Sequence, residues 1–171
     1  MKISYNWLKD HIDTNLRVDE IEPLLTFSGL EVESFEEWSS VKGALKGLVI
    51  GEVLEKQKHP NADRLNLTKV DIGTGEILSI VCGASNVEAG QKVLVAPVGC
   101  TVNPTNGEPF IIQKSKIRGE LSEGMICAED EIGLGTDHAG IMVLPADAKV
   151  GTLAADYFRI ENDFSIEIGL T

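Results

Sequence analysis

Short apolar runs, separated by glycine and proline, fill the middle of the chain. In these runs Val, Ile and Leu are enriched and often alternate with polar residues, which is typical of strands. The expected strands are residues 48–55, 65–72, 77–82, 92–98, 110–117 and 141–144. Gly51, inside the first run, indicates a bend. Several short strands at this spacing predict a small β-barrel or β-sandwich.

The two ends of the chain follow a different pattern. Ser4 is placed to cap a short helix over residues 5–12, and apolar residues at helical spacing predict a second helix that ends before Gly29. Residues 30–35 and 164–170 each alternate apolar and polar side chains, as a half-exposed strand does. The last strand has no neighbour in sequence, so it either pairs with residues 30–35 or belongs to a fragment of a longer protein.

The composition of the 171-residue chain is that of a globular protein. Hydrophobic residues make up 43% and charged residues 25%, which excludes a disordered or collagen-like chain. Mean hydropathy is +0.02, and no apolar run approaches the roughly 18 residues of a membrane span. The first residues show no signal-peptide pattern. We therefore expect no membrane contact. Three scattered cysteines form no Cys-x-x-Cys pair, so we expect a reducing, cytoplasmic location.

The net charge of −12 opposes binding to nucleic acid, but the charge is unevenly distributed. The net charge is −6 over residues 1–40, −3 over residues 41–150 and −3 over residues 151–171. The middle segment nevertheless holds eleven of the fifteen Lys and Arg residues. Any surface that contacts a polyanion is therefore expected in the middle of the chain.

The sharpest local motif is His59-Pro60-Asn61-Ala62-Asp63-Arg64-Leu65. Proline keeps the residue before it extended, and Pro-Asn favours a turn, so the motif predicts a connection between two strands. A connector of this kind accounts for its central residues without any ligand. The cations around it are Lys56, Lys58, His59 and Arg64. At the rim of a barrel, such a cluster is suited to contact phosphates.

A second cationic segment is Lys114-Ser115-Lys116-Ile117-Arg118. Strand alternation would place Lys114, Lys116 and Arg118 on one face. That face is either an ordinary solvated surface or a stripe for an RNA backbone, and both interpretations remain open. Asn86, in the turn after Cys82, either caps the local backbone or contacts a base edge, and capping is the commoner role.

The sequence contains no recognisable catalytic or metal-binding motif. The three histidines are far apart, and the acidic run Glu129-Asp130-Glu131 is consecutive and does not converge on one point. Nucleotide-binding glycine loops and the GxSxG motif are absent. Cys82 is expected to be a small core residue rather than a nucleophile. We therefore expect no catalytic residue and no metal ligand.

Several segments, in a fixed order, resemble the tRNA-binding OB-fold domain of aminoacyl-tRNA synthetases. The segments are HPNADRL, KVDIG, IVCGASNV, AGQKVLVAPVG, KSKIRGELSEGMICAEDEIGL and GIMVLP. The flanking segments MKISYNWLKDHID, FSGLEVES and DFSIEIGLT are similar to the beta subunit of bacterial phenylalanyl-tRNA synthetase. The resemblance implies a mainly β fold with α+β flanks, in which an OB-fold barrel (40–150) is inserted in a small discontinuous α/β domain (1–39 and 151–171). It also implies that the chain is an N-terminal fragment.

The resemblance further implies how the work of the enzyme is divided. The parent enzyme would attach phenylalanine to its tRNA with ATP and Mg²⁺, as a cytoplasmic tetramer of two alpha and two beta subunits. Its synthetic, editing and anticodon sites lie in other parts of the family's chains. This chain would therefore be non-catalytic and would hold no cofactor, and its partners would be tRNA and the alpha subunit, not DNA.

The function expected of the barrel is non-catalytic contact with tRNA. Phosphate contacts are expected from Lys56, Lys58, His59, Arg64, Lys114, Lys116 and Arg118, and a sugar or base contact from Asn86. Aromatic residues make up only 5% of the chain, so we expect backbone recognition that weakens with salt rather than base stacking. The alternative is a structural module that packs against other synthetase domains with little tRNA contact, and the net charge of −3 over residues 41–150 supports it.

Overall fold

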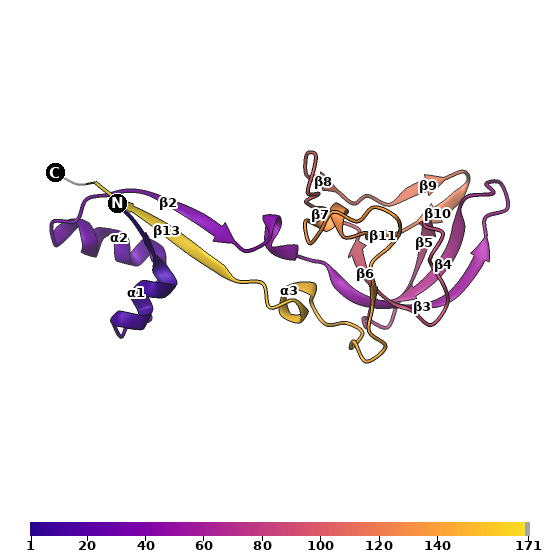
Figure 1. The fold of residues 1–171 in the computed structure, drawn as a ribbon, viewed down its shortest axis with the longest axis horizontal. Coiled ribbons are helices and arrows are strands. Elements are labelled where there is room, and N and C mark those ends of the chain that lie inside the picture. Colours follow the sequence, from indigo (N-terminus) through magenta and orange to yellow (C-terminus); the bar gives the residue numbers. More distant parts are fainter. Residues whose placement is uncertain (170–171) are drawn as a thin grey trace. The chain divides into compact units, whose positions relative to one another are not determined.

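The computed structural model describes residues 1–169, which form two compact units (Figure 1). One unit consists of Met1–Ser40 with the chain from Glu161 onward, and the other of Val41–Ile160. The predicted last strand (164–170) and the predicted terminal segment (151–171) extend to Leu170 and Thr171. These two residues lie outside the described residues.

The terminal unit is a three-stranded antiparallel sheet with two helices. Its elements are β1 (Lys2–Ser4), α1 (Tyr5–His11), α2 (Val18–Phe27), β2 (Val32–Ser39) and β13 (Asn162–Ile168). β13 lies between β1 and β2, so of the two alternatives for the last strand, the structure shows the pairing with the 30–35 region. The Ser4 hydroxyl accepts a hydrogen bond from Trp7 N (2.9 Å), which confirms the predicted cap of the first helix. The buried residues of this unit are Tyr5, Ile21, Ile166 and Ile168.

The Val41–Ile160 unit is a nearly closed antiparallel β-barrel. Its main strands are β3 (Val49–Lys58), β4 (Asn66–Asp71), β5 (Ile77–Cys82), β6 (Lys92–Pro97) and β11 (Gly124–Ile126), in the spatial order β11-β6-β3-β4-β5. The first part of β3 pairs with β6 and the second with β4, and the register shifts between Val53 and Glu55. A shift of this kind bends a long strand, which helps it to serve both sides of a barrel. The predicted mainly β, OB-like fold is confirmed.

The connection between β6 and β11 forms two small hairpins. β7 (Thr101–Val102) pairs with β8 (Phe110–Ile111), and β9 (Ser115–Ile117) pairs with β10 (Glu120–Ser122). The single strand predicted over residues 110–117 is therefore wrong. The chain leaves strand geometry over residues 112–114, because the residues up to Ile112 hydrogen-bond to the β7 side of the first hairpin, whereas residues 115–117 pair with β10.

The remaining short elements lie beside the barrel strands. They are η1 (Lys42–Leu45), η2 (Asp130–Ile132), β12 (Val143–Leu144), which pairs with β6, and α3 (Ala154–Tyr157). Ala154 N donates a hydrogen bond to Leu48 O (2.9 Å), and Ile50 N donates to Thr152 O (2.9 Å). These bonds attach the segment after residue 150 to the barrel, and the boundary of this unit accordingly lies at Ile160.

The barrel has an apolar core on both sides of β6. Val93, Leu94, Val95 and Ala96 are all fully buried. Successive residues of a strand point to opposite faces, and the two faces of β6 enter two different clusters. Leu94 and Ala96 pack in a cluster that includes Leu48, Ile50 and Ala154, whereas Val93 and Val95 pack with Val53, Val70 and Ile80. This double burial holds the strands rigidly and positions the loops at their ends.

Candidate nucleic-acid interface

The loop of residues 59–65 connects β3 to β4 in a tight turn. His59 N donates a hydrogen bond to Leu65 O (3.0 Å), and Leu65 N donates to Ala62 O (3.1 Å). The predicted strand connector is therefore confirmed. The turn leaves Lys58, at the end of β3, and Arg64, within the loop, exposed to solvent.

The β9–β10 hairpin presents two more exposed cations. Lys116 lies in β9, and Arg118 lies in the two-residue turn that follows Ile117. The φ angles of Arg118 (53°) and Gly119 (98°) are both positive, as a tight hairpin turn that matches the strand twist requires. Both cationic side chains are exposed.

His59 joins these two cationic segments. Its Nε2 lies 3.1 Å from Ile117 O, across 58 residues of sequence, and its Nδ1 accepts a hydrogen bond from Asn61 N (3.0 Å). The 59–65 loop and the β9–β10 hairpin are thus held side by side. Within residues 1–169, no ion pair involves the four exposed cations that these segments carry. We name Lys58, Arg64, Lys116 and Arg118 the cationic rim.

His59 itself is not placed to contact a phosphate. Its side chain is buried, with 5% of the residue exposed, and each ring nitrogen faces a backbone partner. The expected phosphate contact by His59 is therefore corrected. The motif's histidine is buried, whereas the four cations of the rim are exposed.

Lys56 and Lys114 are engaged by carboxylates. Lys56 Nζ lies 2.7 Å from Glu88 Oε1, and Lys114 Nζ lies 2.8 Å from Glu123 Oε1. The Lys114 hydrogen bond, with one from Ser79 N, lowers the pKa of the Glu123 carboxyl group. The expectation that Lys114, Lys116 and Arg118 share one strand face is wrong, because Lys114 precedes β9 and Arg118 occupies the turn.

Asn86 has a structural role in the turn after β5. Its Nδ2 donates a hydrogen bond to Ile141 O (2.9 Å), and its Oδ1 accepts one from Ile141 N (3.0 Å). Both ends of the amide are therefore engaged by the backbone of one residue. Of the two interpretations of Asn86, the structure favours backbone capping over contact with a base.

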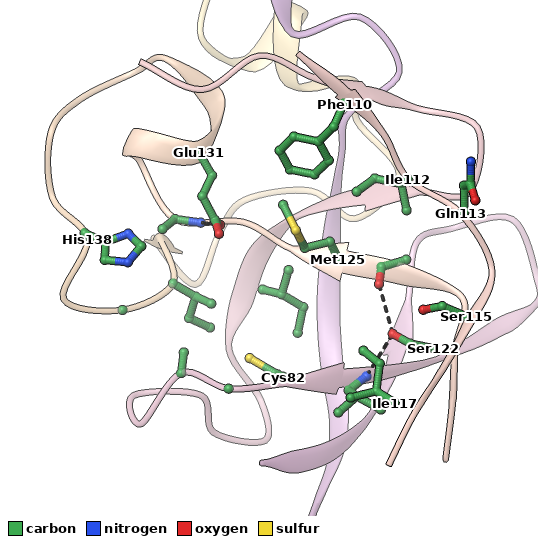
Figure 2. A pocket seen from close by; sticks show the side chains of 18 of the residues that line it. Cys82, Phe110, Ile112, Gln113, Ser115, Ile117, Ser122, Met125, Glu131 and His138 are labelled. Carbon is green, nitrogen blue, oxygen red and sulfur yellow. Dashed lines mark hydrogen bonds between the residues drawn. The ribbon is translucent and has the colours of Figure 1, made fainter. Parts of the chain in front are cut away.

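A cavity of about 720 Å³ lies between the end of β5, β11 and the segment that contains β8 and β9 (Figure 2). Phe110 and Ile117 line it together with the buried Cys82, and Glu131 and His138 contribute polar groups. Phe110 is 42% exposed, so it offers an accessible aromatic face that the sequence did not single out. His138 Nδ1 lies 2.8 Å from Asp130 Oδ2, an interaction across a loop that sequence reasoning missed.

The cysteines are core residues. Cys82, Cys100 and Cys127 are all free and buried. Burial raises the pKa of each thiol, so the thiolate needed by a nucleophile or a metal ligand is disfavoured. The prediction that Cys82 belongs to the core is confirmed.

Residues 1–169 contain no group of three or more His, Cys, Asp or Glu side chains arranged to hold a metal ion. No helix in the same range is long and apolar enough to cross a membrane.

The strand order and the cationic rim beside the 59–65 loop are features of an OB-fold nucleic-acid-binding domain. Comparison with known proteins leads to a particular family. A family model described as "Putative tRNA binding domain" matches residues 48–153. The chain belongs to this family.

Curated relatives match the whole chain, including both flanks. The chain is 56% identical over 171 residues to the phenylalanine–tRNA ligase beta subunit of Bacteroides thetaiotaomicron and 51% identical over 171 residues to that of Porphyromonas gingivalis. It is 48% identical over 170 residues to that of Neisseria meningitidis. These matches cover 98–100% of this chain but 21% of each relative, so the chain spans about a fifth of their length.

A solved structure, the C-terminal domain of Plasmodium vivax p43, also matches. The TM-score is 0.43 and the identity 24%, over 61% of this chain and 56% of that chain.

Proposed function

We propose that the barrel binds tRNA through the sugar–phosphate backbone and performs no chemistry itself. The observation that carries this proposal is the cationic rim: two segments remote in sequence, joined by the His59–Ile117 hydrogen bond, carry four exposed cations that form no ion pair within residues 1–169, in a protein of net charge −12. Exposed Lys and Arg side chains bind phosphates by releasing counterions, and this binding requires no particular base sequence. The family match supports the choice of tRNA over other nucleic acids.

The wider role proposed here follows the curated relatives. The chain would serve as the tRNA-contacting N-terminal region of a phenylalanine–tRNA ligase beta subunit, beside an alpha subunit in a cytoplasmic α₂β₂ enzyme that uses ATP and Mg²⁺. Residues 1–169 offer no set of side chains that fits a metal ion, so we assign no step through magnesium to this chain. Its proposed contribution is to hold the tRNA.

A structural module is the second candidate function. The ion pairs Lys56–Glu88 and Lys114–Glu123 reduce the cationic surface, and the barrel region remains net negative. In that role the barrel would pack against other synthetase domains. Its affinity for tRNA would be no higher than that of any other acidic protein. Binding measurements at low salt separate the two candidates.

The test is a titration of labelled tRNA between 50 and 200 mM salt. Four phosphate contacts give a slope of about −3.6 for log affinity against log salt, so affinity should fall about 150-fold over this range. The double reversal K116E/R118E should reduce the slope to about −1.8 or less and the fall to about 12-fold. The matched control is K42E/K149E, which makes the same charge change at exposed lysines of η1 and of the segment before α3.

The outcomes are distinct. A reduced slope for K116E/R118E together with an unchanged slope for K42E/K149E supports the proposal. Equal losses in both double variants would show that only the overall charge matters. No binding by the wild-type protein at 50 mM salt would contradict the proposal and favour the structural module.

A further inference from the structure

We propose that His59 is a positioning residue: a neutral imidazole that fixes the hairpin cations beside the loop cations, so that all four act on one RNA backbone. The proposal rests on tRNA binding as the function of the rim. In this role, the histidine of the HPNADRL motif affects RNA binding only through the position of other residues and does not contact RNA itself.

The hydrogen bonds of His59 define its tautomer. Nδ1 faces the N–H of Asn61 at 3.0 Å, so Nδ1 must be the acceptor and carry no proton. Nε2 faces the carbonyl oxygen of Ile117 at 3.1 Å, so Nε2 must carry the proton and donate it. A neutral ring satisfies both partners at once. Protonation of Nδ1 would displace the Asn61 N–H.

Few hydrogen bonds join the β9–β10 hairpin to the barrel, although Glu120 and Leu121 line a small pocket together with residues of β3, β4 and β5. Among the strands of residues 1–169, β9 and β10 pair only with each other. At the base of the hairpin, Ser122 Oγ accepts a hydrogen bond from Val81 N (3.1 Å), and Glu123 N donates to Ser79 O (2.8 Å). Among the described residues, the bond from His59 to Ile117 is the single hydrogen bond that joins residues 115–121 to the rest of the barrel.

The bonded atoms lie directly beside the cations. Ile117 is flanked by Lys116 and Arg118, and His59 follows Lys58. Fixing Ile117 O to the His59 ring therefore fixes the spacing between the two halves of the rim. Loss of this bond would leave the fold of the barrel and all four charges in place but would release the hairpin tip. The two hairpin cations would then no longer be held within reach of the RNA backbone that binds the loop cations.

Two conservative substitutions separate the two bonds of His59. In H59N, the amide oxygen occupies the position of Nδ1 and can accept from Asn61 N, as asparagine does in an Asx turn, but the side chain is too short to reach Ile117 O. In H59Q, the longer amide can donate to Ile117 O. G51A, which strains β3 away from the rim, serves as a control for a general loss of stability.

The experiment measures tRNA affinity between 50 and 200 mM salt and amide hydrogen exchange without RNA for the wild-type protein and the three variants. We expect a fall of about 150-fold for the wild type, H59Q and G51A, and of about 12-fold for H59N, as two of four contacts are lost. Exchange at residues 115–121 should rise at least tenfold in H59N and less than threefold in H59Q. Rescue by H59Q is the result that a purely structural histidine would not give.

Different results overturn different claims. If H59N keeps the wild-type salt dependence while the wild type binds tRNA, the role of His59 is refuted and the proposed function stands. If H59N leaves exchange at the hairpin tip unchanged, the link itself is refuted. If the wild type does not bind tRNA, the proposed function fails and so does the RNA role of His59, whatever the exchange data show.

Discussion

The side chain of Asn86 joins the turn after β5 to the segment before β12. It exchanges two hydrogen bonds with the backbone of Ile141, at 2.9 and 3.0 Å. Ile141 is only 6% exposed, but Asn86 is an exposed residue, so the two hydrogen bonds are partly buried. Asn86→Ala would remove both hydrogen bonds and leave the partly buried N–H and C=O of Ile141 without their side-chain partner.

The expected cost follows from these two groups. A typical hydrogen bond contributes about 0.5–1.5 kcal/mol to stability, so we expect the loss of both bonds to lower the free energy of unfolding by about 1–3 kcal/mol. For a chain of this size, each kcal/mol lowers Tm by about 2–4 °C. Asn86→Asp is the matched variant. It keeps an acceptor for Ile141 N but turns a carboxylate oxygen toward Ile141 O, so it should destabilise at least as much as alanine.

Thermal unfolding followed by circular dichroism measures the stability change, and tRNA titration at 50 mM salt measures the binding. We expect Tm to fall in both variants, while tRNA affinity, measured well below Tm, stays within about twofold of the wild type. The opposite result, an unchanged Tm with weakened tRNA binding, would refute the structural role and would make Asn86 a contact to the RNA.

Three further outcomes are expected. Gly51→Ala should lower the stability of the barrel by about 1–3 kcal/mol in urea unfolding, because the added Cβ would lie 2.8 Å from Val95 Cγ2; an unchanged midpoint would contradict the packing. Burial raises the pKa of Asp163, but hydrogen bonds from Ser4 and from backbone amides outweigh it and hold the pKa below its usual 3.8. A folded pKa below the unfolded one stabilises the terminal unit above about pH 4, and this stabilisation is lost as pH falls through the folded pKa. Asp163→Asn should therefore flatten the acid limb of a pH–stability curve, and an unchanged limb would count against the assignment. Burial raises the pKa of the Cys127 thiol, so iodoacetamide should label it at pH 8 only at the rate of unfolding; rapid labelling of native protein would contradict its burial.

The strands and caps that depend on neighbouring residues could be predicted from the sequence. The β-branched runs at residues 77–82 and 92–98 became β5 and β6, and the cap by Ser4 was confirmed. These features rest on side-chain alternation and on a bond over three residues, both of which a single sequence contains.

Features that depend on distant partners could not be predicted. The sequence placed His59 on the surface with the lysines, but its burial depends on Ile117, 58 residues away. The prediction that three cations share one strand face was wrong because the pairing of the β9–β10 hairpin places Arg118 in the turn. The sequence predicted a bend at Gly51. In the structure, glycine is needed there because Val95, on the neighbouring strand β6, approaches too closely for a side chain at this position.

The central claim is that the cationic rim is the surface that meets tRNA, and mapping amide chemical shifts by NMR during a titration with tRNA tests it most directly. We expect the signals of residues 58–65 and 115–121 to shift or broaden first, while those of Lys42 and Lys149 remain unchanged. Shifts confined to other parts of the barrel, or no shifts at a salt concentration of 50 mM, would contradict the claim.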